Sequence, residues 1–302
     1  MRGKGWRKVG WIGLLTVSLT VLLSGCSAKE WERNLRFGWP TGVTKQAERM
    51  RVLWTWSSVA ALAVGAIVWG LIFWCCIRYR KRSDALPRQR RENLAIEFAY
   101  TIIPFFIIGV LFWRTVVVEN YVDKKTAHPD TTVLVTAFKW NWQFTYRDAD
   151  SKYPSNTGSS AGDYANTVGT STEIPILVIP LGETVRIQEH SRDVIHSFWV
   201  PEFLFKRDVI PQPKDNQFEF TATSLGHYVG RCAELCGTYH SQMNFEVRVV
   251  TPDKYEAYKQ ALTALGPGDP ARQSKALKSI GEDPLATTTH PFNTNRSDRK
   301  SS

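Results

Sequence analysis

The sequence predicts a two-helix transmembrane hairpin followed by an all-β domain of the sandwich or barrel type. Residues 52–77 carry no charge, and a second apolar stretch runs over residues 94–118. Each stretch is long enough to cross the hydrocarbon core of a membrane as a helix. After Val118 the pattern changes to short runs in which apolar and polar residues alternate, which is typical of β-strands.

Residues 1–25 predict an export signal, because a basic start is followed by an apolar core and by small residues. The Leu-Ser-Gly-Cys sequence of residues 23–26 resembles a bacterial lipobox, which predicts removal of the signal and lipidation of Cys26. Ordinary cleavage beside an incidental cysteine and an uncleaved signal anchor are the alternatives. Residues 26–51 then form an external N-terminal segment.

The charge pattern between the two spans predicts the topology. Residues 78–93 are strongly basic, as in loops that stay in the cytoplasm. Glu97 and Arg114 lie near the ends of the second span, where long side chains can reach the interface. We therefore expect a multi-pass protein of the bacterial plasma membrane, with residues 119–265 as a domain on the outer face.

The formal net charge of +10 is not spread over a folded domain. Four basic residues lie within the first eight residues, and residues 78–91 carry seven basic residues against one aspartate. The rest of the chain is balanced. This distribution argues against a nucleic-acid-binding surface and favours a membrane protein.

The outer domain contains two regions that do not resemble strands. Residues 149–172 form a polar insertion rich in Gly, Ser, Thr and Asn, which in a compact domain is either mobile or used to contact a partner. Residues 252–265 have helical spacing of apolar residues and are expected to pack at the end of the barrel. Residues 266–302 have the composition of a flexible tail.

A set of metal-ligand side chains lies within twelve residues near the end of the domain. Cys232, Cys236, His240 and Met243 offer two thiols, an imidazole and a thioether, which is a soft-metal ligand set. Zinc sites and thioredoxin-like motifs expect two cysteines separated by two residues, and a mononuclear blue-copper site needs one cysteine. Two bridging thiolates fit a copper pair better, and His196 is the candidate for a second imidazole.

The segments DVIHSFWVP (193–201) and CAELCGTYHSQM (232–243) together resemble the paired signature of cytochrome c oxidase subunit II. The resemblance covers about residues 50–260 and includes the two-helix hairpin. It implies a cupredoxin fold, which is a Greek-key β-barrel or sandwich, with a binuclear CuA centre. The lipobox and the insertion resemble the actinobacterial members of this family.

Carried over residue by residue, the resemblance implies a role for each ligand of the copper pair. Cys232 and Cys236 would bridge two copper ions, His196 and His240 would each bind one of them, and Met243 would be a weak ligand.

The resemblance also implies roles outside the thiol pair. Glu234 would bind copper through its backbone carbonyl, and its side chain together with Asp208 would hold magnesium at the boundary with subunit I. Trp140 would be the point at which electrons enter, and Glu97 the mouth of a proton-uptake channel. The structural alternatives are a solvated loop carboxylate for Asp208, a core tryptophan for Trp140 and a helix-end carboxylate for Glu97.

The function implied by the resemblance is electron transfer in a respiratory chain. The chain would accept electrons from a c-type cytochrome or a cytochrome bc complex and pass them to haems that lie in subunit I. There oxygen is reduced to water and protons are pumped; subunit III is a further expected partner. The sequence contains no CxxCH motif, which excludes a fused c-type haem.

Three other classes of protein share some of these features. A membrane-tethered copper carrier would have exposed ligands and labile copper. Subunit II of a quinol oxidase has the hairpin and the barrel without the copper ligands. Nitrous oxide reductase shares the copper motif but has no such hairpin.

Overall fold

The computed structural model describes residues 36, 38–81, 83–84, 91–147, 149 and 165–289. The chain divides into two compact units, residues 1–41 and 42–302, and the helices and strands given below belong to the second unit. The export signal predicted over residues 1–25 and the lipidation predicted at Cys26 lie outside the described residues.

The first membrane helix, α3 (Lys45–Arg78), begins inside the predicted external segment of residues 26–51. The Thr44 hydroxyl caps its start by accepting a 3.0 Å hydrogen bond from the Ala47 N–H. Ala47 is fully buried. The first turn of α3 therefore packs against protein, and only the later turns have the exposed apolar surface of a membrane span.

The second membrane helix, α4 (Leu94–Val122), begins where the sequence predicts and continues past Val118. The Asn93 side chain accepts a 3.3 Å hydrogen bond from the Ile96 N–H, and the Glu97 carboxylate accepts a 2.9 Å hydrogen bond from the Asn93 N–H. These two bonds satisfy N–H groups that have no partner inside the helix. The last turns of α4 bury part of their surface.

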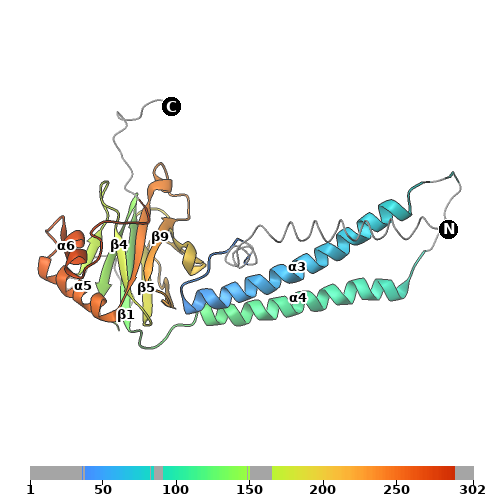
Figure 1. The fold of residues 1–302 in the computed structure, drawn as a ribbon, viewed down its shortest axis with the longest axis horizontal. Helices are drawn as coiled ribbons and strands as arrows, with labels where there is room; N and C mark the ends of the chain where they lie inside the picture. Colours follow the sequence, from blue (N-terminus) through green and yellow to red (C-terminus); the bar gives the residue numbers. More distant parts are fainter. Residues whose placement is uncertain are drawn as a thin grey trace, which may run out of the picture. The chain divides into compact units, whose positions relative to one another are not determined.

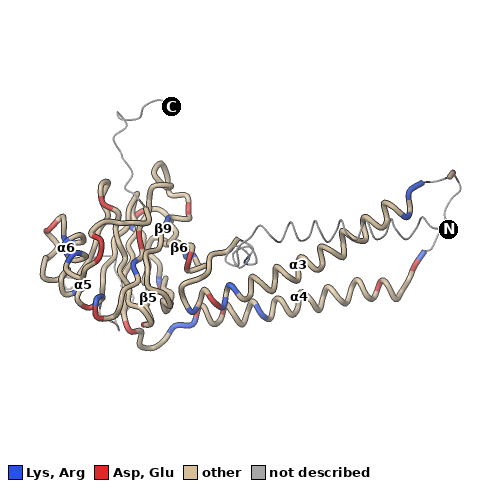
Figure 2. The backbone as a smooth tube through the Cα atoms, in the orientation of Figure 1, with Lys and Arg blue, Asp and Glu red and all other residues tan. Residues whose placement is uncertain are grey.

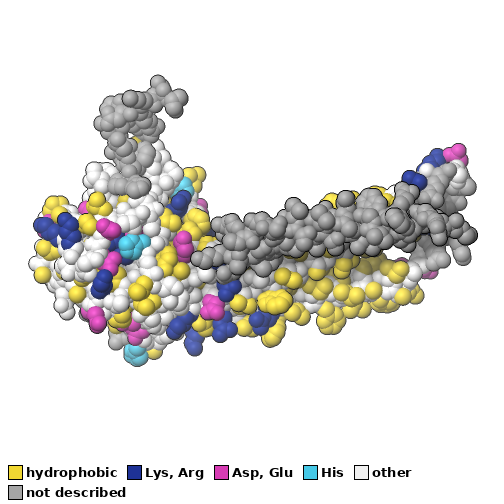
Figure 3. All heavy atoms as spheres, in the orientation of Figure 1, with side chains coloured by type: hydrophobic (Ala, Val, Ile, Leu, Met, Phe, Trp, Pro, Cys, Tyr) yellow, Lys and Arg dark blue, Asp and Glu magenta, His cyan; other side chains and the backbone are white. Residues whose placement is uncertain are grey.

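Both helices are long and apolar enough to cross a membrane, by length and composition. Apolar side chains cover much of their visible surface, and the charged residues gather toward the helix ends (Figures 2 and 3). The basic loop between them is only partly described, since residues 82 and 85–90 lie outside the described ranges.

The outer domain consists of two five-stranded sheets that enclose one core (Figure 1). The first sheet has the order β3-β2-β1-β5-β8 and the second the order β4-β10-β9-β6-β7. The strands of the first sheet are β1 (Thr131–Phe138), β2 (Asn141–Arg147), β3 (Asn166–Val168), β5 (Thr184–Ser191) and β8 (Gln217–Thr221). Those of the second are β4 (Ile176–Pro180), β6 (His196–Val200), β7 (Phe205–Val209), β9 (Gly226–Cys232) and β10 (Asn244–Val250), with two short 3₁₀ turns, η1 (Pro201–Phe203) and η2 (His240–Gln242). The predicted fold class, a helical hairpin followed by an all-β sandwich, is confirmed.

The core between the sheets is rich in aromatic rings. Trp142 from the first sheet packs edge-on against Phe245 from the second at a centroid distance of 5.2 Å, and Phe198 stacks on Phe245 at 4.8 Å. At Gly230, on β9, an added Cβ would lie 2.1 Å from the Phe245 ring, so only glycine fits. This core fixes the ends of β6, β9 and β10, which carry the candidate metal ligands.

The polar insertion predicted over residues 149–172 is partly ordered structure. Asn166–Val168 form β3, which pairs antiparallel with β2 and makes the edge of the first sheet. The polar composition did not predict this strand, because three residues are too short a run for alternation to be visible. Residues 150–164 lie outside the described residues.

After the predicted helix α5 (Pro252–Leu265), the expectation of a flexible tail from residue 266 is wrong as far as residue 289. A further helix, α6 (Arg272–Ser279), packs against the domain with Ala276 and Leu277 buried. The buried Gln273 side chain accepts a 2.8 Å hydrogen bond from the Ile176 N–H of edge strand β4. Residues 290–302 lie outside the described residues.

The segment after α6 is held by a buried ion pair on β10. Arg248 and Glu246 are both fully buried, and Arg248 Nη2 lies 2.7 Å from Glu246 Oε1. Arg248 Nη2 also donates to the Leu285 carbonyl at 2.9 Å, while Glu246 accepts from the Thr287 and Thr288 N–H groups at 2.7 and 2.8 Å. Polar residues therefore order this segment through backbone hydrogen bonds, which a composition-based prediction cannot detect.

Candidate metal centre

Paired strands bring the candidate ligands His196 and Cys232 together. His196 is the first residue of β6 and Cys232 the last residue of β9. The two strands are antiparallel neighbours, with Phe198 opposite Cys232. Two residues that are 36 positions apart in the chain thus meet at one end of two neighbouring strands in the interior of the second sheet.

The other candidate ligands lie on the loop that joins β9 to β10. Cys236 is in this loop, His240 begins η2, and Met243 directly precedes β10. The Cys232 N–H donates a 3.1 Å hydrogen bond to the Met243 carbonyl, which closes the loop at its base. The loop is also fixed to β6, because the Ala233 N–H donates to the carbonyl of Ser197.

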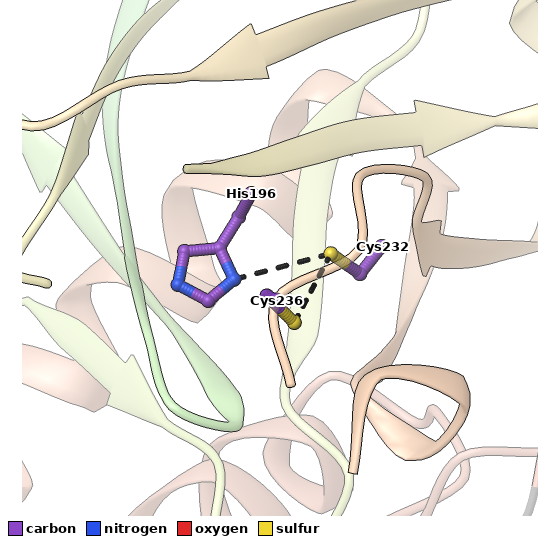
Figure 4. Close-up of side chains that lie close together, drawn as sticks. All are labelled: His196, Cys232 and Cys236. Atoms are coloured by element: carbon purple, nitrogen blue, oxygen red, sulfur yellow. Dashed lines mark hydrogen bonds between the residues drawn. The ribbon is translucent and has the colours of Figure 1, made fainter. Parts of the chain in front are cut away.

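The donor atoms form a compact group (Figure 4). The Sγ atoms of Cys232 and Cys236 are 3.8 Å apart. His196 Nδ1 lies 3.9 Å from the Cys232 sulfur, His240 Nδ1 lies 3.6 Å from the Cys236 sulfur, and Met243 Sδ lies 3.9 Å from the same sulfur. The sulfurs are too far apart for a disulfide, whose length is about 2.05 Å. A metal with thiolate bonds of about 2.3 Å can contact both.

The two thiols differ in acidity although both are buried. Burial raises the pKa of Cys232, but hydrogen bonds with His196 and with the backbone of Glu234 and Ser197 outweigh it and lower this pKa to about 7. Burial and the negative charge of Cys232 raise the pKa of Cys236 to about 12. The pair therefore does not ionise fully by itself, and a bound cation would supply the charge that keeps both thiols as thiolates.

Two supporting residues were missed by the sequence analysis. Asp193 Oδ1 lies 2.8 Å from His196 Nε2, and because a carboxylate only accepts, this contact makes Nε2 the protonated nitrogen and leaves Nδ1 facing Cys232. The sequence could have indicated Asp193, because this aspartate lies three residues before the candidate ligand His196. The buried Trp142 indole N–H donates to the Met243 carbonyl at 3.2 Å, which no local pattern indicates.

Trp140 lies in the turn between β1 and β2, half-buried, and contacts the cysteine loop directly. Its indole N–H donates a 3.2 Å hydrogen bond to the Cys236 carbonyl. Its ring packs in a T-shaped arrangement against Tyr239, with 5.0 Å between the ring centroids. Gly237 adopts a φ of +121°, and an added Cβ there would lie 3.2 Å from the indole. Trp140 and Tyr239 also line an open cleft of about 310 Å³. Unlike Trp142, Trp140 is therefore not a core residue.

Asp208 and Glu97 lie away from the thiol pair. Asp208, on β7, is exposed and lies 3.6 Å from Lys206 Nζ. Asp208 is paired with Ser197 of β6. The Ser197 carbonyl accepts a hydrogen bond from the N–H of Ala233, the residue before Glu234. Glu97 caps the start of α4 as described above. The structure thus gives Glu97 a helix-capping role.

The fold and the site together define a class of protein: a β-sandwich domain on a two-helix membrane hairpin, with a buried cluster of thiol, imidazole and thioether donors. Residues 131–250 match the family model for the periplasmic domain of cytochrome c oxidase subunit II. The protein named "Probable cytochrome c oxidase subunit 2" of Nocardia farcinica is 47% identical, over 98% of this chain and 90% of that relative. "Cytochrome c oxidase subunit 2" of Mycobacterium tuberculosis is 41% identical, over 97% and 91%.

Among solved structures, the chain matches the periplasmic domain of subunit II of cytochrome oxidase (CoxB) of Bradyrhizobium japonicum. It is 26% identical, with a TM-score of 0.38, and covers 47% of this chain and 98% of that chain. The chain belongs to the cytochrome c oxidase subunit II family, and the predicted resemblance, including that to actinobacterial members, is confirmed. It is a membrane protein with an outer domain, and a subunit of cytochrome c oxidase.

The family implies copper of the CuA type, and the residues present fit it. Thiolate, thioether and imidazole donors select copper over magnesium or calcium. His196, Cys232 and Cys236 form a buried group, and the half-buried His240 and the buried Met243 lie beside the Cys236 sulfur. The Glu234 carbonyl is a further donor in reach, 3.3 Å from the Cys232 sulfur.

Proposed function

We propose that this chain accepts electrons from a c-type cytochrome, or a cytochrome bc complex, at a two-copper centre and passes them to haems in subunit I. Oxygen reduction and proton pumping take place there. Cys232 and Cys236 would bridge the coppers, His196 and His240 would each bind one through Nδ1, and Met243 would be a weak ligand. The Glu234 carbonyl completes the proposed set.

One observation carries this proposal: each thiol has its own imidazole. His196 Nδ1 lies beside the Cys232 sulfur and His240 Nδ1 beside the Cys236 sulfur, while the two sulfurs are 3.8 Å apart. A site for a single blue copper would need one thiolate and two imidazoles around it. Two thiolates, each with an imidazole, suit two metal ions.

When bound, the coppers would supply a one-electron redox couple shared over two ions. The contribution of the protein is rigidity. His196, Met243 and both cysteines are buried, and their backbone is tied to β6 and to the base of the loop. Ligands held in place in this way move little between redox states, which favours fast electron transfer.

The proposed direction of transfer follows from residues on different sides of the cluster. Trp140, at an open cleft, would receive electrons from the donor, because its indole is hydrogen-bonded to the Cys236 carbonyl. Asp208 and the Glu234 side chain would hold magnesium at the boundary with subunit I. Glu97 would mark the mouth of a proton-uptake channel at the cytoplasmic end of α4.

The proposed topology places the basic loop of residues 78–93 in the cytoplasm and the domain of residues 119–265 outside the bacterial plasma membrane. Subunits I and III would contact the exposed apolar surfaces of α3 and α4. In this proposal Cys26 carries a lipid that adds a further anchor, although it lies outside the described residues.

Electron paramagnetic resonance of the full-length chain in detergent, loaded with copper, tests the proposal. We expect two coppers per chain and hyperfine splitting from two equivalent copper nuclei. Splitting from a single nucleus, or one copper per chain, would reject the two-copper centre. Cys232→Ser is the matched variant: it removes one bridging thiolate and should abolish the two-nucleus signal.

The same sample separates an electron-transfer site from a copper carrier. Buried ligands predict copper that exchanges slowly with a competing chelator, because the domain must open before the metal leaves. Rapid, complete transfer of copper to the chelator without loss of fold would favour the carrier.

A further inference from the structure

Asp193 makes contacts on two sides of the candidate centre. Its Oδ1 accepts from His196 Nε2 at 2.8 Å, and its Oδ2 accepts from the Lys139 backbone N–H at 2.7 Å. His196 is a proposed copper ligand, and Lys139 directly precedes Trp140 in the turn between β1 and β2. One carboxylate thus joins a residue of the second sheet to a turn of the first.

A second hydrogen bond links that turn back to the thiols. The Trp140 indole N–H donates to the Cys236 carbonyl, and the Cys236 sulfur is 3.8 Å from that of Cys232, which in turn lies beside His196. The contacts form a closed ring from His196 through Asp193 and the turn to the cysteine loop. Asp193 is therefore in contact both with the ligand and with the turn that carries the indole.

We propose that Asp193 is a positioning residue that orients the His196 ring for metal binding and, through Lys139, holds Trp140 against the cysteine loop. This inference rests on the proposed function and extends it. Asp193 does not bind the metal in this proposal. A single carboxylate would thus affect both the copper ligand His196 and Trp140, the proposed point of electron entry.

The chemistry of the His196 contact gives the direction of the effect. A carboxylate that accepts the Nε2 proton makes the imidazole a stronger donor through Nδ1. A stronger donor stabilises the more oxidised, more positive metal. Loss of the carboxylate should therefore raise the midpoint potential of bound copper, and it should weaken copper binding by about 10- to 100-fold.

A purely structural role is the competing explanation, because Asp193 Oδ1 also accepts from the Val194 N–H at 2.7 Å and so shapes its own turn. A turn residue of that kind would change stability when replaced, but it would not move the potential. The measurement must therefore report on the metal as well as on the fold.

The test compares Asp193→Asn with Asp130→Asn in the full-length chain. Asparagine keeps the size of aspartate, but it is uncharged and has one acceptor oxygen in place of two, so it cannot accept from both His196 Nε2–H and the Lys139 N–H as the carboxylate does. Asp130 is the matched control, because its Oδ2 also accepts a backbone hydrogen bond, from the Thr184 N–H at 2.7 Å. The readouts are the copper dissociation constant, the midpoint potential, and the stopped-flow rate of reduction by a reduced c-type cytochrome.

We expect Asp193→Asn to raise the midpoint potential, to weaken copper binding about 10- to 100-fold and to slow reduction by the cytochrome, whereas Asp130→Asn changes none of these. Equal potentials and affinities in the two variants would overturn the inference. If the unmodified chain showed a single-copper signal, the two-copper proposal would fail, but the comparison of potentials would still decide the role of Asp193.

Discussion

The indole N–H of Trp140 donates a 3.2 Å hydrogen bond to the backbone carbonyl of Cys236, so a half-buried ring beside an open cleft is joined to the loop that carries the thiols. The contact depends on Gly237, whose missing Cβ leaves room for the indole. In the proposed function, electrons that enter at this ring would have a short path, through the hydrogen bond, to a proposed copper ligand.

Replacing Trp140 with phenylalanine should slow electron uptake without changing the copper centre. Phenylalanine keeps an aromatic ring but loses the N–H that reaches the Cys236 carbonyl. We expect the stopped-flow rate of reduction by a c-type cytochrome to fall by at least about tenfold, a barrier increase of roughly 1.4 kcal/mol. The midpoint potential and the resonance spectrum of the copper should stay the same; a large change in either would mean that Trp140 acts on the ligands instead.

Gly230→Ala should destabilise the outer domain. An added methyl group would lie 2.1 Å from the Phe245 ring, in a core that has no room to yield. Overpacking of this kind costs about 1–3 kcal/mol. Thermal unfolding of the full-length chain, followed by near-ultraviolet circular dichroism, should show a lower midpoint, whereas Gly268→Ala, with nothing within 4 Å of the added atom, should leave it nearly unchanged.

Arg248→Met should release the segment that follows α6. The substitution leaves Glu246 buried without its partner, which typically costs about 3–5 kcal/mol. It also removes the donor to the Leu285 carbonyl. Hydrogen exchange should show faster exchange of the Thr287 and Thr288 amides.

The control for Arg248→Met is Lys275→Ala. Lys275 pairs with Asp269 on the surface, with 55% of its side chain exposed. Loss of such a pair costs about 0–1 kcal/mol. Equal destabilisation by both variants would show that the buried pair does not anchor the segment.

The stability of the domain should fall in acid partly through Glu246. Burial raises the pKa of this carboxyl, but hydrogen bonds from the Thr288 N–H and from Arg248 outweigh it and lower the pKa below the ordinary value of 4.5. A lowered folded-state pKa contributes stability that is complete above the unfolded value and is lost as the pH falls through the folded value. Denaturant unfolding from pH 7 down to pH 3 should therefore show a steeper loss for the unmodified chain than for Glu246→Gln. Parallel curves would assign the acid sensitivity to other carboxyls.

The candidate ligands were predictable because most of them lie in one short segment. Cys232, Cys236, His240 and Met243 fall within twelve residues, and a loop can close around a metal over that distance without help from the rest of the chain. The two helices were equally visible, since an uncharged apolar run needs no tertiary partner to be recognised.

The segments that were predicted incorrectly depend on distant partners. The polar composition after residue 266 suggested a flexible tail, but Gln273 bonds to the Ile176 N–H of edge strand β4, and Arg248 bonds to the Leu285 carbonyl. A short strand at Asn166–Val168 exists because β2 offers it an edge. None of these partners is near in sequence.

The amino-acid sequence alone determined the membrane hairpin, the strand-rich domain and the identity of the thiol, imidazole and thioether donors, because these follow from local composition and spacing. Tertiary structure decided which atoms face each other: that His196 presents Nδ1 to Cys232, that Asp193 holds its other nitrogen, and that Trp140 rather than Trp142 reaches the surface. Those relationships arise from the pairing of β6 with β9 and the packing of two sheets, which are set by contacts between residues far apart in the chain.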